Sequence, residues 1–358
     1  MRVGLIITGD LELRSGQQVY ARYLVDYLRH TGDSVDVISL PRVGYTRQLL
    51  GNLSGALAKR VQAAQLDVLL QDETAHPALL RLNQQLRGHV PIISLVGRLR
   101  SSEQELYRSI ERRYLQSVDG FICQSETTRQ AVSQLLDRTE LARSVVVPPG
   151  GDRFNQQVTP EIITQRVQEP GPLRLVFVGD VIKRKGLLIL LEALLKSPPG
   201  MCQLAVVGNT DLDALHLRVV YHLLLVTELR GVTLTGLVDD ADLAKLLSHS
   251  QLVVIPSANS GSGAAYLEGM GFGLPAIGTT SGAAGEFITD GVNGYLVPPN
   301  DPATLAERLQ TLAADRSKLA QMSLAARESY LVHPDWEDNM ARVRQTLLDW
   351  IAASGQRD

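Results

Sequence analysis

Short apolar runs recur along the whole chain, and helix-like stretches separate them. Each run is bounded by Gly, Pro or polar residues, which is typical of a buried strand. Strands that alternate with helices predict parallel, doubly wound α/β sheets, because parallel strands need a crossover and a helix supplies it. We expect strands at residues 2–8, 34–40, 67–70, 91–96, 120–123, 144–147, 173–178, 204–208, 231–236, 251–256 and 274–278.

The length of 358 residues predicts two domains, since one hydrophobic core rarely grows beyond about 250 to 300 residues. Apolar residues make up 44% of the chain, which is enough for two cores. Residues 159–172 hold three prolines and show little apolar periodicity, so we expect the domain boundary there. The predicted domains are residues 1–165 and 172–334, followed by a last helix within 335–358.

The most informative stretch is residues 251–297, which reads as strand, small-residue loop, helix, strand. Gly261 and Gly263 allow the backbone to approach a ligand, and the amides at the start of the following helix suit an anion such as a diphosphate. Glu268 lies about one turn into that helix, where its carboxylate can accept from a sugar hydroxyl. The alternative is an ordinary Gly and Ser loop that only ends a strand.

The same stretch resembles the donor-site signature of retaining GT-B glycosyltransferases of family 4. The resemblance covers about forty residues, from PSANSGSGAAYLEGMGFGLPAIG to DGVNGYLV. The family pattern is matched in register by Pro256, Ser257, Gly261, Gly263, Leu267, Glu268, Met270, Gly273, Pro275, Glu286, Asn293 and Gly294. Upstream, residues 179–186 resemble the family's Gly-Arg-x-x-x-x-Lys-Gly, and residues 148–152 resemble its Pro-x-Gly-x-Asp turn.

The resemblance implies two Rossmann-like domains that face each other across a cleft, with the terminal helix crossing back onto the first. It implies transfer of a sugar from a nucleotide-sugar donor, such as a UDP-, GDP- or ADP-sugar, to an acceptor hydroxyl, with retention and without a metal or other cofactor. Lys185 would hold the diphosphate and Glu268 the ribose. The donor-binding set is Gly16, Arg184, Lys185, Ser260, Gly261, Ser262, Gly263 and Glu268, with Arg184 added by our own inference.

Four departures from the family pattern fall on the polar contacts with substrate. Gly97 stands where the family has His, Asp180 where it has Arg, and Ser260 where it has the first Glu. The first glycine loop keeps only Gly16. Each lost charge-assisted hydrogen bond is worth roughly 1.5 to 3 kcal/mol. The alternative function is therefore a catalytically degenerate GT-B protein that serves as a binding or regulatory subunit of an active partner. A protein partner or a homo-oligomer is expected as the alternative state of assembly.

Acceptor-side candidates follow the third predicted strand. Ligands of open parallel sheets bind at the carboxyl ends of the strands, so Asp72, Glu73 and His76 are candidates for a base or a hydrogen-bond partner of the acceptor. A polar loop before Pro77 would also contain such residues without any role in catalysis.

One local basic cluster consists of Arg98, Arg100, Arg108, Arg112 and Arg113. The last three lie on a helix predicted at 102–116, with Ser102 and Glu105 as a capping box. The cluster suits anionic lipid headgroups or a phosphorylated acceptor, and a solvated helix face is the alternative.

Several classes of function and site are disfavoured. A net charge of −3 gives no basis for nucleic-acid binding. Asp211 and Asp213 precede a predicted helix, which favours N-capping over a metal site. The start of the chain does not resemble a signal peptide, and no apolar run reaches the eighteen residues of a membrane-spanning helix. The two cysteines fit a reducing compartment. We therefore expect a cytoplasmic protein, and peripheral attachment to the inner membrane face stays open. No pattern in the sequence identifies the donor base and sugar, the acceptor or the oligomeric state.

Overall fold

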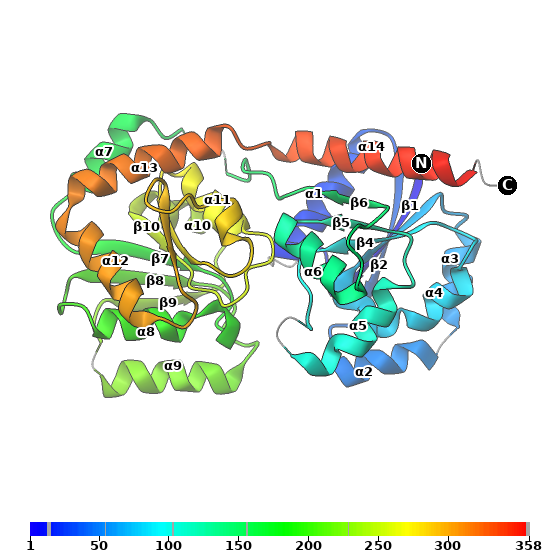
Figure 1. Cartoon of the computed structure of the whole chain (residues 1–358), viewed down its shortest axis with the longest axis horizontal. Helices are drawn as coiled ribbons and strands as arrows, with labels where there is room; N and C mark the ends of the chain where they lie inside the picture. Colours follow the sequence, from blue (N-terminus) through cyan, green and yellow to red (C-terminus); the bar gives the residue numbers. More distant parts are fainter. Residues whose placement is uncertain (13–15, 54, 102–103, 155–156, 228, 356–358) are drawn as a thin grey trace. The chain divides into compact units, whose positions relative to one another are not determined.

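A computed structural model of the chain describes residues 1–12, 16–53, 55–101, 104–154, 157–227 and 229–355. The chain divides into two compact units (Figure 1). The first unit contains residues 1–150 and 335–358, and the second contains residues 151–334.

The first unit is built on a six-stranded sheet whose strands pair in parallel, in the order β2-β1-β3-β4-β5-β6. Side chains that alternate along β1 enter two different cores: Ile6 packs on one face of the sheet, and Leu5 and Ile7 pack on the other. Both faces are therefore covered, as a parallel sheet requires. The strands are β1 Arg2–Thr8, β2 Ser34–Leu40, β3 Val68–Asp72, β4 Ile92–Val96, β5 Gly120–Cys123 and β6 Ser144–Val146.

Helices connect these strands and cover the sheet. The α-helices are α1 Gly16–His30, α2 Tyr45–Leu49, α3 Ala56–Ala63, α4 Leu80–Leu86, α5 Arg108–Leu115, α6 Glu126–Leu136 and α14 Trp336–Gly355. Short 3-10 helices occur at η1 Leu50–Leu53, η2 Glu73–Ala78 and η3 Glu105–Tyr107. Helices α1 and α14 lie side by side and share one core with the sheet.

The second unit has the same design, with strand order β12-β11-β10-β7-β8-β9. Its strands are β7 Leu173–Val178, β8 Cys202–Val207, β9 Val232–Gly236, β10 Leu252–Val254, β11 Ala276–Thr279 and β12 Gly294–Val297. Its helices are α7 Pro160–Gln168, α8 Leu187–Leu195, α9 Ala214–Val226, α10 Asp240–His249, α11 Ala264–Gly271, α12 Pro302–Ala314 and α13 Arg316–Leu331, with 3-10 turns η4 Lys183–Lys185 and η5 Ala283–Glu286. The prediction of parallel, doubly wound sheets is confirmed in both units.

The boundary between the units lies earlier than the proline-rich segment suggested. The division falls at Gly150, and residues 160–168 form helix α7 inside the second unit. Thr159 caps this helix and Pro160 occupies its first turn, where a missing amide costs nothing. Ile163 and Val167 are buried, so the segment is part of the second unit and is not a linker.

The terminal helix α14 is anchored in the first unit by Trp336. Its ring stacks on Tyr23 at 4.1 Å between centroids and meets Tyr20 edge-on at 5.7 Å. Trp350, near the other end of α14, lies against the backbone of Gly120. The two tryptophans therefore hold both ends of α14 against the first unit.

Removal of the Trp336 ring should destabilise the first unit. Trp336 is 4% exposed, so Trp336→Ala should lower the free energy of unfolding by about 3 to 5 kcal/mol. Urea denaturation followed by far-UV circular dichroism measures the change. Val332→Ala is the control, because Val332 is 83% exposed. A loss below about 1 kcal/mol for Trp336→Ala would show that this anchor is not needed.

Candidate functional site

In the second unit, the strand order reverses at β7, which pairs with β8 on one side and with β10 on the other. Ligands of open α/β sheets bind at such a switch point, outside the carboxyl ends of the strands. The segments that leave β7 and β10 are residues 179–186 and 255–263, and they contain most of the predicted donor-binding residues. The fold thus places these residues where a ligand site is expected.

Hydrogen bonds to Arg184 and a close backbone approach at Gly186 join the two segments. The carbonyl oxygen of Arg184 accepts from the amide of Ala258 at 2.9 Å and from the hydroxyl of Ser257 at 3.1 Å. Gly186 has a φ of +78°, and a Cβ atom there would overlap the carbonyl group of Pro256. Glycine is therefore required at 186 both by its conformation and by this close approach.

Lys185 is held at the end of β7 by this turn. Its side chain runs along Gly179, since a Cβ atom at 179 would lie 3.3 to 3.4 Å from its Cδ, Cε and Nζ atoms. The turn carries three basic side chains, Lys183 to Lys185, and one acidic side chain, Asp180. Its net charge is positive despite the acidic residue in the position where the family has Arg.

Helix α11 begins at the far end of the second segment. Gly263 caps it with a φ of +70°, and a side chain at 263 would overlap the ring of Phe287. The first amides of a helix have no acceptor within the helix, and they carry partial positive charge. Ser260 is buried, and its backbone pairs with Gly282. Backbone contacts thus hold the loop from 260 to 263 in place, and the helix amides and the Ser260 hydroxyl are its polar groups.

Glu268 is held by an arginine that the sequence analysis did not single out. Its Oε1 accepts from Arg153 Nη1 at 2.7 Å, and Arg153 Nη2 donates to Asp240 Oδ1, also at 2.7 Å. Burial raises the pKa of Glu268, and the positive charge of Arg153 opposes that rise. Arg153 directly follows the Pro-x-Gly-x-Asp turn, which was the one signal in the sequence that pointed to it.

In the first unit, Asp72 and His76 are committed to the local structure. Asp72 caps the 3-10 helix η2, where its Oδ1 accepts from the amide and the hydroxyl of Thr74 at 2.8 Å each. His76 Nδ1 donates to the carbonyl of Glu73 at 2.8 Å, and its Nε2 accepts from the Tyr45 hydroxyl at 3.1 Å. Burial lowers the pKa of His76 to about 4, so the ring is neutral at pH 7.

Glu73 is the candidate acceptor-side residue whose carboxylate links several segments. Gln17 Nε2 donates to its Oε2, and the amide of Gly97 donates to the same oxygen at 3.4 Å. Burial and the neighbouring charge of Asp72 raise the pKa of Glu73 well above its ordinary value. These residues follow β1, β3 and β4, so the cluster lies at the carboxyl edge of the sheet, beside the switch point of this unit at β1 and β3.

Gly97 shows how the family's His position is filled. A Cβ atom at 97 would lie 3.0 Å from Gln124 Oε1 and 3.2 Å from Gln17 Nε2. The two glutamine side chains therefore occupy the space that a histidine would need. Gly16 begins helix α1 and is exposed, directly before Gln17.

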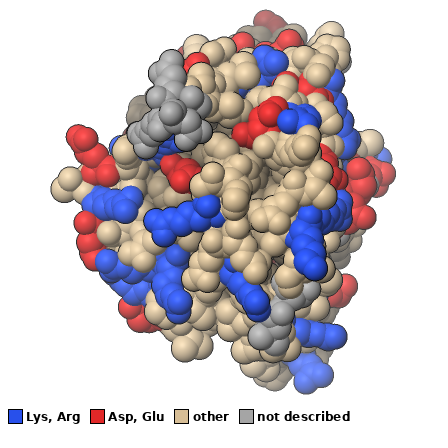
Figure 2. Space-filling view, turned by 90° about the vertical axis from the view of Figure 1, so that its right-hand side faces the viewer, with Lys and Arg blue, Asp and Glu red and all other residues tan. Residues whose placement is uncertain are grey.

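The basic cluster is partly neutralised within the first unit. Arg112 pairs with Asp137 at 2.7 Å and Arg108 with Glu105 at 3.5 Å, while Arg100 lies over the ring of Tyr45. Figure 2 shows basic side chains in several separate groups, with acidic ones among them. The predicted helix at 102–116 is shorter than expected, since α5 begins at Arg108, and Ser102 of the capping box lies outside the described residues.

Two further features lie apart from these sites. Asp213 caps α9 by accepting from the amide of His216 at 3.0 Å, which confirms its prediction as an N-cap.

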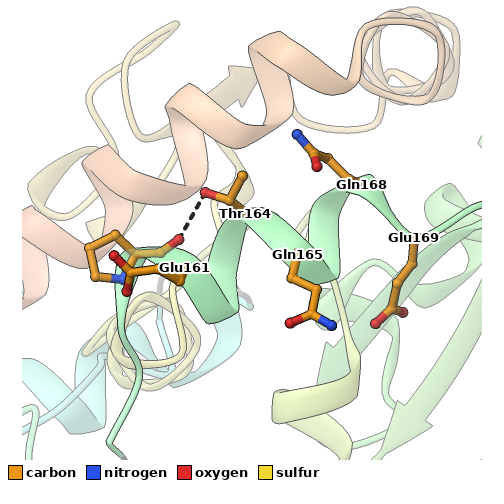
Figure 3. Close-up of a pocket in the computed structure, with 6 residues that line it drawn as sticks. Glu161, Thr164, Gln165, Gln168 and Glu169 are labelled. Carbon is orange, nitrogen blue, oxygen red and sulfur yellow. Dashed lines mark hydrogen bonds between the residues drawn. The ribbon is translucent and has the colours of Figure 1, made fainter.

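An open depression runs along α7 (Figure 3), where Thr164 Oγ1 donates to the carbonyl of Pro160 at 2.8 Å. It is lined by Pro160, Glu161, Thr164, Gln165, Gln168 and Glu169. None of these belongs to either group of site residues.

Comparison with known proteins gives consistent relatives. Residues 172–315 match the family model described as glycosyl transferases group 1. The chain is 29% identical over 229 residues to D-rhamnosyltransferase WbpZ of Pseudomonas aeruginosa, and 31% identical over 211 residues to O-antigen chain mannosyltransferase C of Escherichia coli. These alignments cover 63% and 58% of this chain but only 58% and 54% of the relatives.

A third relative aligns along its whole length. Phosphatidyl-myo-inositol mannosyltransferase of Mycobacterium leprae is 25% identical over 398 aligned positions, covering 100% of this chain and 99% of the relative.

Two solved structures share the fold with a TM-score of 0.80. Sucrose-phosphate synthase from Thermosynechococcus elongatus is 20% identical, with 98% of this chain and 99% of that chain covered. HepE from Anabaena, in complex with UDP-glucose, is 19% identical, with 98% and 100% covered.

The buried His76 should make the first unit sensitive to acid. The folded-state pKa of about 4 lies below the ordinary value of 6.5, so the unfolded chain binds more protons between these values. This contribution to stability is complete above pH 6.5 and is lost as the pH falls toward 4. Between pH 7 and pH 5 the loss should be about 2 kcal/mol, measured by urea unfolding.

The variant His76→Gln isolates this contribution from that of the carboxylates, because it cannot titrate. Its loss of stability between pH 7 and pH 5 should be about 2 kcal/mol smaller than that of the wild type. The exposed His89 gives the matched control, His89→Gln, which should behave like the wild type. Equal pH dependence in His76→Gln and the wild type would contradict the assignment.

Proposed function

The chain belongs to the group 1 glycosyltransferases and has their GT-B fold, and from this premise we propose that it transfers a sugar from a nucleotide-sugar donor to an acceptor hydroxyl, with retention at the anomeric carbon. The proposal rests on the hydrogen bonds that join the Lys185 turn to the segment that leads into helix α11. This contact joins a cationic turn to the segment that precedes helix α11, beside one switch point of the sheet.

The diphosphate of the donor is the anion that suits this edge. Lys185 and its basic neighbours supply full positive charge, and the first amides of α11 supply hydrogen-bond donors. Because the leaving group is a nucleoside diphosphate, these groups also stabilise the negative charge that develops as the glycosidic bond breaks. The charge that a divalent cation supplies in other transferases would come here from the protein.

Glu268 is the proposed acceptor for the ribose hydroxyls, and Ser260 to Gly263 are the proposed contacts with phosphate and sugar. A UDP-, GDP- or ADP-sugar fits this description, and the complex of HepE with UDP-glucose supports a nucleotide-sugar as the class of donor. The relatives named for rhamnose and mannose transfer support a hexose as the transferred group.

On the acceptor side, Glu73 is the proposed hydrogen-bond partner or base. Asp72 and His76 support it locally, since Asp72 caps η2 and His76 fixes the carbonyl of Glu73. Gly16, beside Gln17, is proposed as the remaining backbone contact of the first loop. No described helix is long and apolar enough to cross a bilayer. Peripheral contact with the inner membrane face through Arg98, Arg100, Arg108, Arg112 and Arg113 stays a proposal.

The donor assignment predicts the effect of Lys185→Ala. Loss of one charge-assisted contact should weaken binding of the tightest of UDP, GDP and ADP by about ten- to a hundredfold, measured by isothermal titration calorimetry. Lys196→Ala is the matched control, since Lys196 is an exposed lysine at the end of α8. Unchanged binding in Lys185→Ala would contradict a diphosphate at this turn.

A second candidate function, a degenerate binding or regulatory subunit, is favoured by two observations. The polar edge of the first unit is filled by its own side chains, since Gln17 and Gln124 occupy the space beside Gly97. Helix α9 also presents exposed apolar side chains, among them Leu215 at 74% and Leu225 at 79% exposure. Exposed apolar surface of this kind is typical of a protein interface.

Release of nucleoside diphosphate from bound nucleotide-sugar separates the two functions. A transferase should release it, at least slowly to water, and Glu73→Gln should lower the rate at least tenfold with donor binding unchanged. Tight donor binding without any release, together with self-association or complex formation that Leu215→Ser abolishes, would favour the degenerate subunit.

A further inference from the structure

Arg153 stands three residues after Gly150, where the chain leaves the first unit, and it bridges two helices of the second. Its Nη1 contacts Glu268 on α11 and its Nη2 contacts Asp240, the first residue of α10, at 2.7 Å each. The guanidinium also lies 5.1 Å from the ring centroid of the buried Phe154. Two carboxylates and one aromatic ring therefore fix its position.

The pair between Arg153 and Glu268 is almost completely removed from solvent. The Arg153 and Glu268 side chains are 9% and 10% exposed, while Asp240 is 51% exposed. A buried carboxylate is costly to ionise unless a cation pairs with it, and here Arg153 supplies that cation. The ionised form of Glu268 thus depends on Arg153.

Geometry also assigns the two oxygens of Glu268 different tasks. Arg153 binds Oε1, and the donated hydrogen bond sets the plane of the carboxylate. The other oxygen, Oε2, would then accept from a ligand in a direction that this plane sets. Lysine would supply the same charge without the planar fork that spans Glu268 and Asp240.

We infer that Arg153 is the positioning residue of the donor site: it keeps Glu268 ionised and oriented, so that this carboxylate recognises the ribose diol of the nucleotide. The inference rests on the proposed function and adds the residue that determines ribose specificity.

The test compares a ribonucleotide with its analogue that lacks both ribose hydroxyls. Calorimetry gives the affinities of UDP and 2′,3′-dideoxy-UDP, or of the GDP or ADP pair if that base binds tighter. The wild type should prefer the ribonucleotide by about tenfold or more at pH 7.5. Arg153→Gln should reduce this preference below about threefold, and Arg153→Lys should give an intermediate value.

The pH dependence gives a readout that a merely structural role would not change. The charged groups that face Glu268 are Arg153 and Asp240. Only the ionised carboxylate is the strong acceptor, so the ribose preference is lost as the pH falls through the pKa of Glu268. The midpoint of that loss should move to higher pH in Arg153→Gln, which removes the cation, and to lower pH in Asp240→Asn, which removes a like charge.

Controls keep the outcomes distinct. Arg174→Gln breaks an ion pair of the same length, Arg174 with Glu169 at 2.7 Å, outside the candidate site, and should leave the preference unchanged. Should Arg153→Gln not fold, Arg153→Lys and the half-exposed Asp240→Asn carry the test. An unchanged preference and midpoint in these variants, or wild-type binding without ribose preference, overturns the inference and leaves the proposed function standing. Failure of the wild type to bind any nucleotide overturns both.

Discussion

The close approach of Gly186 to Pro256 is the contact on which the donor site depends. It exists because β7 and β10 are neighbours in the sheet although more than seventy residues separate them in sequence. A side chain at 186 would push the two segments apart, and the hydrogen bonds from Ser257 and Ala258 to Arg184 would then be lost. The turn that carries Lys185 and the segment that leads into α11 are therefore brought together by backbone packing at a switch point.

Electrostatics then divides the polar residues into two groups with different environments. In the second unit, burial raises the pKa of Glu268, and the positive charge of Arg153 opposes that rise. In the first unit, burial and the neighbouring carboxylate of Asp72 raise the pKa of Glu73 well above its ordinary value, and the hydrogen bonds from Gln17 and Gly97 oppose that rise. A carboxylate paired with a cation suits recognition of a diol, whereas a buried carboxyl group beside another carboxylate suits proton transfer or donation.

Strands β1 to β11 could be predicted from sequence because each is a short apolar run, whereas β12 Gly294–Val297 was missed. The N-cap role of Asp213 followed from its place before a helix. The division at Gly150 lies before the segment that three prolines suggested as a linker, and Thr159 followed by Pro160 is also a helix-start signal. Arg153 could not be recognised as a site residue. Its partners lie 87 and 115 residues away, and only the folded sheet brings them together.

The proposed diphosphate site consists of the turn at Lys185 and the amino end of α11. A crystal structure of the protein with a bound nucleoside diphosphate would show whether both contact the phosphates. We expect the β-phosphate within hydrogen-bond distance of Lys185 Nζ and of a backbone amide between residues 261 and 265. A nucleotide bound elsewhere, with Lys185 and these amides making no contact to phosphate, would show that they do not form a diphosphate site.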